Sequence, residues 1–403
     1  MADTSALPAP ALLRTRNAVG LTFGLNGFLF ATLVARLPDI RGHLDLDNGA
    51  LGLLLLAISC GSILALPATG RLIGRFGASA VVRAGVVSCA VGLSTAGVAA
   101  GALESVAATA VAFFVYGIGI GVWDVAMNVE GAEVERLLGR TVMPRFHAGW
   151  SLGSIAGAGL GIPLTALSLP MPVHLGAACV VALAVVWWAA ATFLPAAEPA
   201  IEHAVRPRSA WTEPRLLAIG LMVLAFAVAE GSANDWLALA LIDGYGAEHW
   251  VGVAGFSLFV TAMTGGRLLG PLVLDRFGRA PVLWASCAAA GAGILLTVLG
   301  GHPVLVALGI LVWGLGSALG FPVGMSAAAD DPARAAARVS VVSTVGYGAF
   351  LAGPPLLGLL GDHVGTLDAL LVVAALMVPA AVAVLAARPR VPAVRPAASP
   401  VDR

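Results

Sequence analysis

Long apolar stretches, separated by short clusters of Arg, Pro, Asp and Gly, recur along the whole chain. A helix that crosses a lipid bilayer needs about 20 mainly apolar residues. Twelve stretches of about that length are present, at residues 17–36, 49–67, 79–101, 105–129, 146–168, 173–194, 215–240, 250–269, 280–300, 303–327, 337–360 and 367–387. The pattern predicts an all-α membrane protein with twelve transmembrane helices embedded in a lipid bilayer.

Composition supports this prediction and argues against other classes. Of the 403 residues, 59% are hydrophobic and 11% are charged, and the mean hydropathy of +0.95 lies outside the range of soluble globular chains. The formal net charge is zero, and no basic patch with interleaved aromatic residues suggests a nucleic-acid partner. Neither metal-ligand spacing nor a phosphate loop is present. We therefore expect no enzyme activity, no cofactor and no metal.

The basic residues indicate how the chain is oriented, and all 22 of them are arginines. If the amino terminus is cytoplasmic, every arginine except Arg36 and Arg41 is assigned to the cytoplasmic side, and this assignment includes Arg267. Such an excess follows the positive-inside rule. It predicts a multi-pass protein of the bacterial cytoplasmic (inner) membrane with both termini in the cytoplasm.

The spans fall into two sets of six, separated by a segment rich in Pro and charged residues at 195–214. The tripeptide Arg75-Phe76-Gly77 recurs 201 residues later as Arg276-Phe277-Gly278. A repeat of this spacing predicts two pseudo-symmetric six-helix halves, 17–194 and 215–387, related by an axis along the membrane normal. The segment 195–214 then reads as a cytoplasmic linker, and 1–16 and 388–403 as cytoplasmic tails, the last expected to be disordered.

The spans, linker and repeat together resemble the major facilitator superfamily of transporters. The signature loop of that family, G-x-L-x-D-R-x-G-R, is matched in the second copy by Asp275, Arg276, Gly278 and Arg279. The first copy keeps Gly70, Arg75 and Gly77 but has Gly74 in place of the acid and Ala78 in place of the final arginine.

The resemblance implies that this loop links neighbouring helices in the outward-open state. We expect the N-terminal half to lack one charge-assisted latch; the alternative is a short turn whose arginines only set the orientation. A weaker resemblance, to a bacterial inner-membrane branch distantly similar to sugar permeases, rests on Asp124, Asn128, Glu130, Glu135, His147 and residues 230–236.

Acidic residues inside a span are candidates for transport, because a lone charge at mid-membrane costs at least about 2.5 kcal/mol. At 1.5 Å per residue, Glu230 lies about 22 Å into its span, and we expect it to be the most deeply buried acid. It is the favoured proton-coupling residue; the alternative is a static ion pair that sets helix packing. Asp235 lies at the outer edge, and Arg36 can pair with Asp235 or Glu230 as a gate.

A second group of polar residues lies where span 105–129 ends. Asp124 is about 28 Å along this span, at its cytoplasmic edge, which places Glu130 and Glu135 beyond the hydrocarbon. We predict that Asp124, Asn128, Glu130 and His147 form a cytoplasmic network that breaks when the carrier opens inward, with Asp124 as a second proton-coupling candidate. The alternative is a solvated helix end.

Candidates for substrate contact lie nearer the midplane. Asn26 is about 14 Å into the first span, where its amide can bind a polar solute. Further candidates are Asn234, Trp123, Trp150, Trp236, Trp313 and Tyr347. Glycines at every fourth position, Gly149, Gly153, Gly157 and Gly161, predict close packing of span 146–168 against another helix.

The sequence thus predicts a secondary active transporter that moves a small polar solute, sugar-like or an organic metabolite, by alternating access. We expect it to be coupled to protons and to work as a monomer. One alternative is a proton-driven exporter of drugs or hydrophobic compounds. Another is a non-transporting membrane sensor, which ordinarily brings a large soluble domain, whereas no loop here exceeds about twenty residues.

Overall fold

The computed structural model describes residues 9–46, 48–167, 169–195 and 210–388, and the regular structure in these ranges is helical. The N-terminal half contains α1 (Ala9–Val34), α2 (Leu37–His43), α3 (Asn48–Gly101), α4 (Val106–Leu138), α5 (Met143–Ala166) and α6 (Met171–Ala190). The C-terminal half contains α8 (Pro214–Tyr245), α9 (His249–Phe277), α10 (Arg279–Leu299), α11 (Pro303–Ser317), α12 (Gly320–Ala328), η2 (Pro332–Arg334), α13 (Ala335–Val364), α14 (Thr366–Ala369), α15 (Leu371–Ala383) and η3 (Val384–Ala387).

The predicted spans coincide with helices, although their boundaries differ. Ten helices of the described ranges are long and apolar enough to cross a membrane. One of them, Ala50–Gly101, contains two predicted spans, 49–67 and 79–101, and the predicted span 303–327 is divided between α11 and α12. The predicted tail 1–16 is corrected in part, because α1 already begins at Ala9; residues 1–8 and 389–403 and most of the predicted linker lie outside the described residues.

The internal repeat is visible in the backbone. Gly77 interrupts α3 with φ 80° and ψ 159°, and Gly278, between α9 and α10, has φ 78° and ψ 168°. Positive φ of this kind is accessible mainly to glycine. The preceding pairs also match, since Arg75 lies 5.3 Å from the Phe76 ring centroid and Arg276 lies 5.3 Å from that of Phe277. Residues 201 positions apart in sequence therefore adopt the same local structure.

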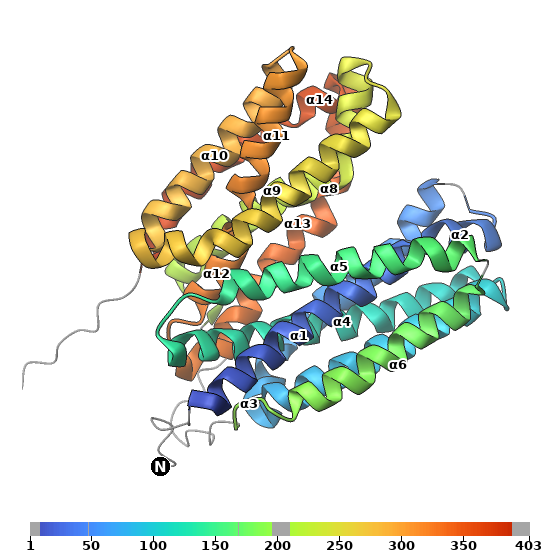
Figure 1. Cartoon of the computed structure of the whole chain (residues 1–403), viewed down its shortest axis with the longest axis vertical. Coiled ribbons are helices and arrows are strands. Elements are labelled where there is room, and N and C mark those ends of the chain that lie inside the picture. Colours follow the sequence, from blue (N-terminus) through green and yellow to red (C-terminus); the bar gives the residue numbers. More distant parts are fainter. Residues whose placement is uncertain (1–8, 47, 168, 196–209, 389–403) are drawn as a thin grey trace, which may run out of the picture.

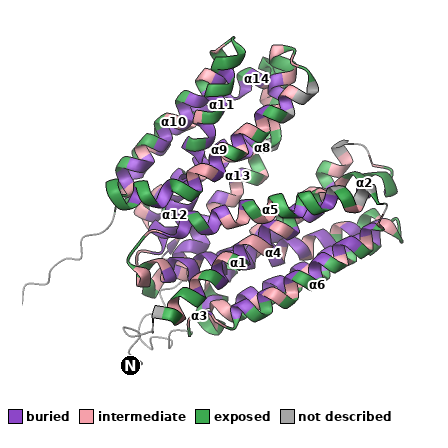
Figure 2. Ribbon diagram, viewed as in Figure 1, coloured by how far each residue is buried: buried purple, intermediate pink, exposed green. Residues whose placement is uncertain are grey.

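The helices form two groups, α1 to α6 and α8 to η3, which meet at one end and diverge toward the other (Figure 1). The end where they meet is where α1 begins, α4 and α9 end, and α10 and α13 begin; it carries Arg75, Arg140, Arg276 and Arg334, and we call it the arginine-rich end. Buried residues follow the faces where helices pack together, and exposed residues cover the outside (Figure 2). The described chain is therefore closed at its arginine-rich end.

The α1 and α5 helices pack with their backbones in direct contact. A Cβ on Gly153 would lie 1.8 Å from the carbonyl oxygen of Gly24, one on Gly27 would lie 2.1 Å from that of Trp150, and one on Gly157 would lie 2.4 Å from that of Phe28. Such distances leave no space for any side chain. The predicted close packing of the glycine repeat in α5 is thus confirmed, and α1 is its partner.

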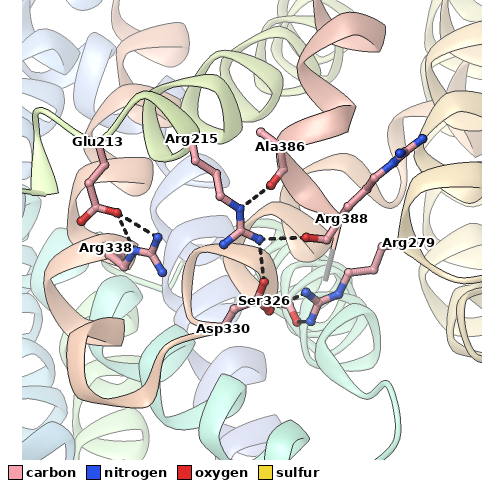
Figure 3. A network of polar contacts seen from close by, with 8 residues as sticks. All are labelled: Glu213, Arg215, Arg279, Ser326, Asp330, Arg338, Ala386 and Arg388. Atoms are coloured by element: carbon pink, nitrogen blue, oxygen red, sulfur yellow. Dashed lines mark hydrogen bonds and ion pairs between the residues drawn. The ribbon is translucent and has the colours of Figure 1, made fainter. Parts of the chain in front are cut away.

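An ionic network holds the beginning of α8 at the arginine-rich end (Figure 3). Glu213, the residue before α8, accepts hydrogen bonds from Arg334 and from Arg338, whose NH2 lies 2.9 Å away. Arg215 donates to Asp330 at 3.0 Å and to the carbonyl oxygens of Ala386 and Arg388. Although Glu213 belongs to the predicted linker 195–214, it is therefore built into the C-terminal helix bundle.

Candidate functional site

A buried ion pair lies at the contact between the two halves. Arg267 of α9 is 3% exposed, and its NH2 donates to Oε2 of Glu230 on α8 at 2.7 Å. Its NH1 donates to the Ser151 hydroxyl of α5 at 3.1 Å, and its Nε donates to the carbonyl oxygen of Ala318, between α11 and α12, at 3.3 Å. One guanidinium group thus joins an acid of the C-terminal half to a hydroxyl of the N-terminal half.

Sequence reasoning placed Arg267 incorrectly. It was counted among the arginines on the cytoplasmic side, but it lies inside α9, ten residues before the helix ends at Phe277, or about 15 Å from that end at 1.5 Å per residue. The rule that singled out Glu230, that a charge inside a span marks a candidate site, applies equally to Arg267. Its position within the predicted span 250–269 was the signal that could have revealed it.

Three residues of the predicted network are joined in the structure. The side-chain amide of Asn128 donates to the Asp124 carbonyl oxygen at 2.9 Å and lies 3.3 Å from Oδ1 of Asp124, while Oδ1 of Asn128 lies 3.2 Å from Nε2 of His147. All three are buried. Tyr347 of α13 lies beside the Asp124 carboxyl group, yet Oδ2 of Asp124 has no hydrogen bond of good geometry within the described chain.

This polar cluster continues toward the ion pair. His147 lies against Phe23 of α1 and Phe321 of α12, with ring centroids 5.0 and 5.6 Å away. The Ser151 hydroxyl, which receives the bond from Arg267, donates to the His147 carbonyl oxygen at 3.3 Å. The cluster around Asp124 and the pair of Arg267 and Glu230 are therefore neighbours along α5.

Glu130 departs from the prediction. Its Oε1 accepts a bond from the backbone N–H of Leu194 at 2.6 Å, after the end of α6, rather than joining Asp124. It is 5% exposed and so is not solvated, because α4 continues to Leu138 and Leu194, after the end of α6, binds the Glu130 carboxyl group. Asp124, 8% exposed, is likewise more buried than the Glu230 side chain, which is 12% exposed. The expectation that Glu230 is the most buried acid is wrong.

Asn26 and Trp150 form a second polar contact between α1 and α5. The indole N–H of Trp150 donates to Oδ1 of Asn26 at 3.0 Å, and Phe30 packs on the indole with ring centroids 5.6 Å apart. Asn26 is 3% exposed, and its Nδ2 has no hydrogen-bond partner among the described residues. A buried amide donor without a partner is costly, and a bound polar solute can satisfy it.

The other predicted aromatic residues lie apart from this contact. Trp123 is fully buried and packs against Gly85 of α3, whereas Trp313 is fully buried with its ring 5.3 Å from that of Phe259. Trp236 lies against Gly358 of α13. These positions fit helix packing, so the geometry brings only Trp150 of the predicted tryptophans to Asn26.

The predicted gate pair of Arg36 with Asp235 or Glu230 is wrong. Arg36 donates to Oδ2 of Asp39 at 2.8 Å, to Nδ1 of His174 at 2.9 Å and to the carbonyl oxygen of Leu169 at 3.0 Å. All three partners lie in the N-terminal half. The carboxylate that binds Arg36 is that of Asp39, only three residues along the chain. Asn234 and Asp235 are exposed on α8.

The signature loops differ between the halves at the arginine-rich end. Oδ1 of Asp275 accepts the backbone N–H of Thr141 at 3.1 Å, from the loop between α4 and α5, and Arg279 donates to Asp330 at 2.5 Å and to Ser326 at 2.8 Å. In the first copy the residue that corresponds to Asp275 is Gly74, which has no side chain. Nothing lies within 4 Å of the position that a Cβ of Gly74 would take.

Glu135 lies across the interface from this second loop. Its carboxylate accepts the backbone N–H groups of Val142 and Met143 at 2.8 and 2.7 Å, and also the Ser326 hydroxyl of the other half. A hollow of about 300 Å³ lies beside these contacts, lined by residues of both halves. The bonds from Thr141 to Asp275 and from Ser326 to Glu135, together with the bond from Ser340 of α13 to the Leu66 carbonyl oxygen of α3, join the two halves.

We expect Asp275→Ala to open this end more often, because the backbone N–H of Thr141 loses its side-chain acceptor in the other half. For an exposed bond of about 1 kcal/mol, the population open at the arginine-rich end rises about fivefold. Labelling of Ala329→Cys, which lines the hollow, in a background without the native cysteines measures this change. The control is Asp362→Ala, which removes an exposed acid on α13. Equal labelling in both variants would show that the bond between Asp275 and Thr141 does not help to close this end.

Comparison with known proteins identifies the family. The sequence profile of the Major Facilitator Superfamily matches residues 19–350 and 256–403. The chain belongs to the Major Facilitator Superfamily. Within it, the chain is 34% identical over 359 residues to the uncharacterized transporter y4wD of Sinorhizobium fredii, covering 87% of this chain and 92% of that protein. It is 31% identical over 358 residues to an uncharacterized MFS-type transporter of Yersinia pestis, covering 85% and 88%.

Solved structures of the superfamily share the fold. The fucose:proton symporter FucP of E. coli superposes with a TM-score of 0.78 at 14% identity, over 94% of this chain and 99% of that one, and FucP in the outward conformation gives the same values. The resemblance drawn from the signature loops is therefore confirmed. The protein is a membrane transporter of the superfamily and not an enzyme.

Proposed function

We propose that the protein carries a small polar solute across the bacterial cytoplasmic membrane by alternating access, as a monomer, and that transport is coupled to protons. The solute is sugar-like or another organic metabolite. The arginine-rich end faces the cytoplasm, as the positive-inside rule predicts, so the conformation described here is open toward the outside. The neighbour named as a fucose:proton symporter supports both the solute class and the coupling.

The observation that carries the proposal is the ion pair of Arg267 and Glu230 at the contact between the halves. Glu230 is the one acid bound to Arg267 among the described residues, and Arg267 also holds Ser151 of the opposite half. When Glu230 takes up a proton, it ceases to be a counter-charge, and the attraction that holds this arrangement weakens. Protonation can thus change the contact between the halves, which alternating access requires.

A solute contact is available nearby on the N-terminal half. Asn26 presents a buried amide donor without a partner, and the half-buried indole of Trp150 offers an apolar face beside it. An amide donor beside an aromatic surface can bind a polar solute with an apolar face. The fully buried positions of Trp123 and Trp313 give no comparable surface, and this favours a polar solute over the large hydrophobic compounds of an exporter.

The test is Glu230→Gln in proteoliposomes. The amide keeps the shape of the side chain but cannot release a proton, so accumulation driven by a pH gradient is expected to fall to the level of empty liposomes. Exchange of labelled for unlabelled solute, which needs no net proton movement, is expected to continue. Transport is measured with a panel of sugars and organic acids, with and without the gradient.

The matched control is Asp362→Asn, which makes the same acid-to-amide change at an exposed position of α13. It is expected to accumulate solute as the wild type does. Gradient-driven accumulation that survives in Glu230→Gln would show that Glu230 does not couple transport to protons.

A further inference from the structure

We infer that the solute bears a carboxylate, which binds the guanidinium group of Arg267 in the place that Glu230 occupies here. The inference rests on the proposed function and names the substrate class of the same site. It adds that Arg267 is the anion-binding residue and that Glu230 is its internal competitor.

The guanidinium group is positioned to bind an anion. Its contacts with Ala318, Ser151 and Glu230 use one N–H on each of its three nitrogens, and a guanidinium carries five N–H donors. NH1 and NH2 therefore each retain a second N–H, and a guanidinium group can bind a carboxylate through two N–H groups at once. Of the two paired side chains, that of Glu230 is the more exposed, at 12% compared with 4% for that of Arg267.

Two buried hydroxyl groups without partners in the described chain lie within three residues of Arg267 or of its partner Ala318. Thr264 lies one turn before Arg267 on the same face of α9, is 8% exposed, and its Oγ1 has no hydrogen bond within the described chain. Ser317 is 1% exposed, its Oγ is likewise unpartnered, and it precedes Ala318, whose carbonyl oxygen Arg267 binds. Hydroxyl groups can donate to a carboxylate or to a neighbouring oxygen of the same solute.

Charge balance explains why an anion and a proton would enter together. A buried arginine needs a counter-charge, since an unpaired charge in a low-dielectric site is strongly unfavourable. Glu230 supplies that charge in the structure described here. If Glu230 becomes neutral by taking up a proton, a solute carboxylate can replace it at Arg267, and the site keeps the same net charge. A neutral solute leaves the guanidinium without a counter-charge.

The test uses purified Glu230→Gln protein in detergent, in which Arg267 has no carboxylate partner. Binding is measured as a shift of the thermal unfolding midpoint with two matched pairs of probes, propionate with propionamide and D-glucuronate with D-glucose. Each carboxylate is expected to bind at least about tenfold more tightly than its neutral counterpart. Equal or tighter binding of the neutral member, or no binding of either carboxylate, would overturn the inference.

Two further variants assign the effect to Arg267. In Glu230→Gln with Arg267→Gln, the preference for carboxylates is expected to disappear, and with Arg267→Lys it is expected to weaken because the ammonium group lacks the fork. A preference that persists without Arg267 places the anion elsewhere and also overturns the inference. None of these measurements uses a proton gradient, so they are independent of the accumulation assay. If neutral solutes bind as well as carboxylates, and Glu230→Gln still loses accumulation, the inference fails but the proposed function stands.

Discussion

Replacing Arg267 by Gln in the otherwise native chain is expected to destabilise the folded protein by about 3 kcal/mol. Removing one member of a buried ion pair typically costs about 3–5 kcal/mol, because the other charge stays buried without a partner. We expect the lower end of that range, since the Glu230 side chain is 12% exposed and solvent partly screens its charge. Unfolding in mixed micelles with increasing sodium dodecyl sulfate, followed by tryptophan fluorescence, measures the change.

The double variant with Glu230→Gln and Arg267→Gln is the control for this prediction. Because it removes both charges together, it is expected to recover most of the lost stability. Ser151→Ala removes a neutral acceptor of Arg267 and a donor to the His147 carbonyl oxygen, and it is expected to cost about 1.5 kcal/mol. A double variant no more stable than Arg267→Gln alone would show that lost packing, and not an unpaired charge, causes the destabilisation.

Much of the architecture could be predicted because it follows from local sequence. Bilayer thickness fixes the length of an apolar span, so hydropathy located the helices. Glycine spacing on α5 indicated a close contact, and the repeated Arg-Phe-Gly anticipated the matching backbone breaks at Gly77 and Gly278. Each of these inferences needs only residues within one element or one turn.

The pairing of charges could not be predicted, because it depends on which helices are neighbours. The partner of Glu230 is 37 residues away on the next helix, and sequence spacing does not show that the two side chains meet. Arg36 was expected to bind an acid on a distant span but binds Asp39, three residues along the chain. Glu130 was placed outside the membrane by counting residues, which does not reveal that Leu194, after the end of α6, binds its carboxyl group.

Gly153→Ala is expected to be the most damaging single methyl addition on α5. A Cβ at this position would lie 1.8 Å from the carbonyl oxygen of Gly24, and the obstacle is backbone, which cannot rotate away as a side chain can. Overpacking typically costs about 1–3 kcal/mol and occasionally more; here α1 and α5 must separate along their length, so we expect at least about 3 kcal/mol in the micelle unfolding assay.

The same helix supplies a matched control. Gly159→Ala adds the same methyl group where nothing lies within 4 Å, and alanine is the better helix former, so its stability is expected to equal or slightly exceed that of the wild type. The separation of α1 and α5 also sets the bond of 3.0 Å from Trp150 to Asn26. Gly153→Ala should therefore weaken solute binding as well as stability. If both variants unfold alike, the backbone contact between α1 and α5 does not hold the proposed solute site together.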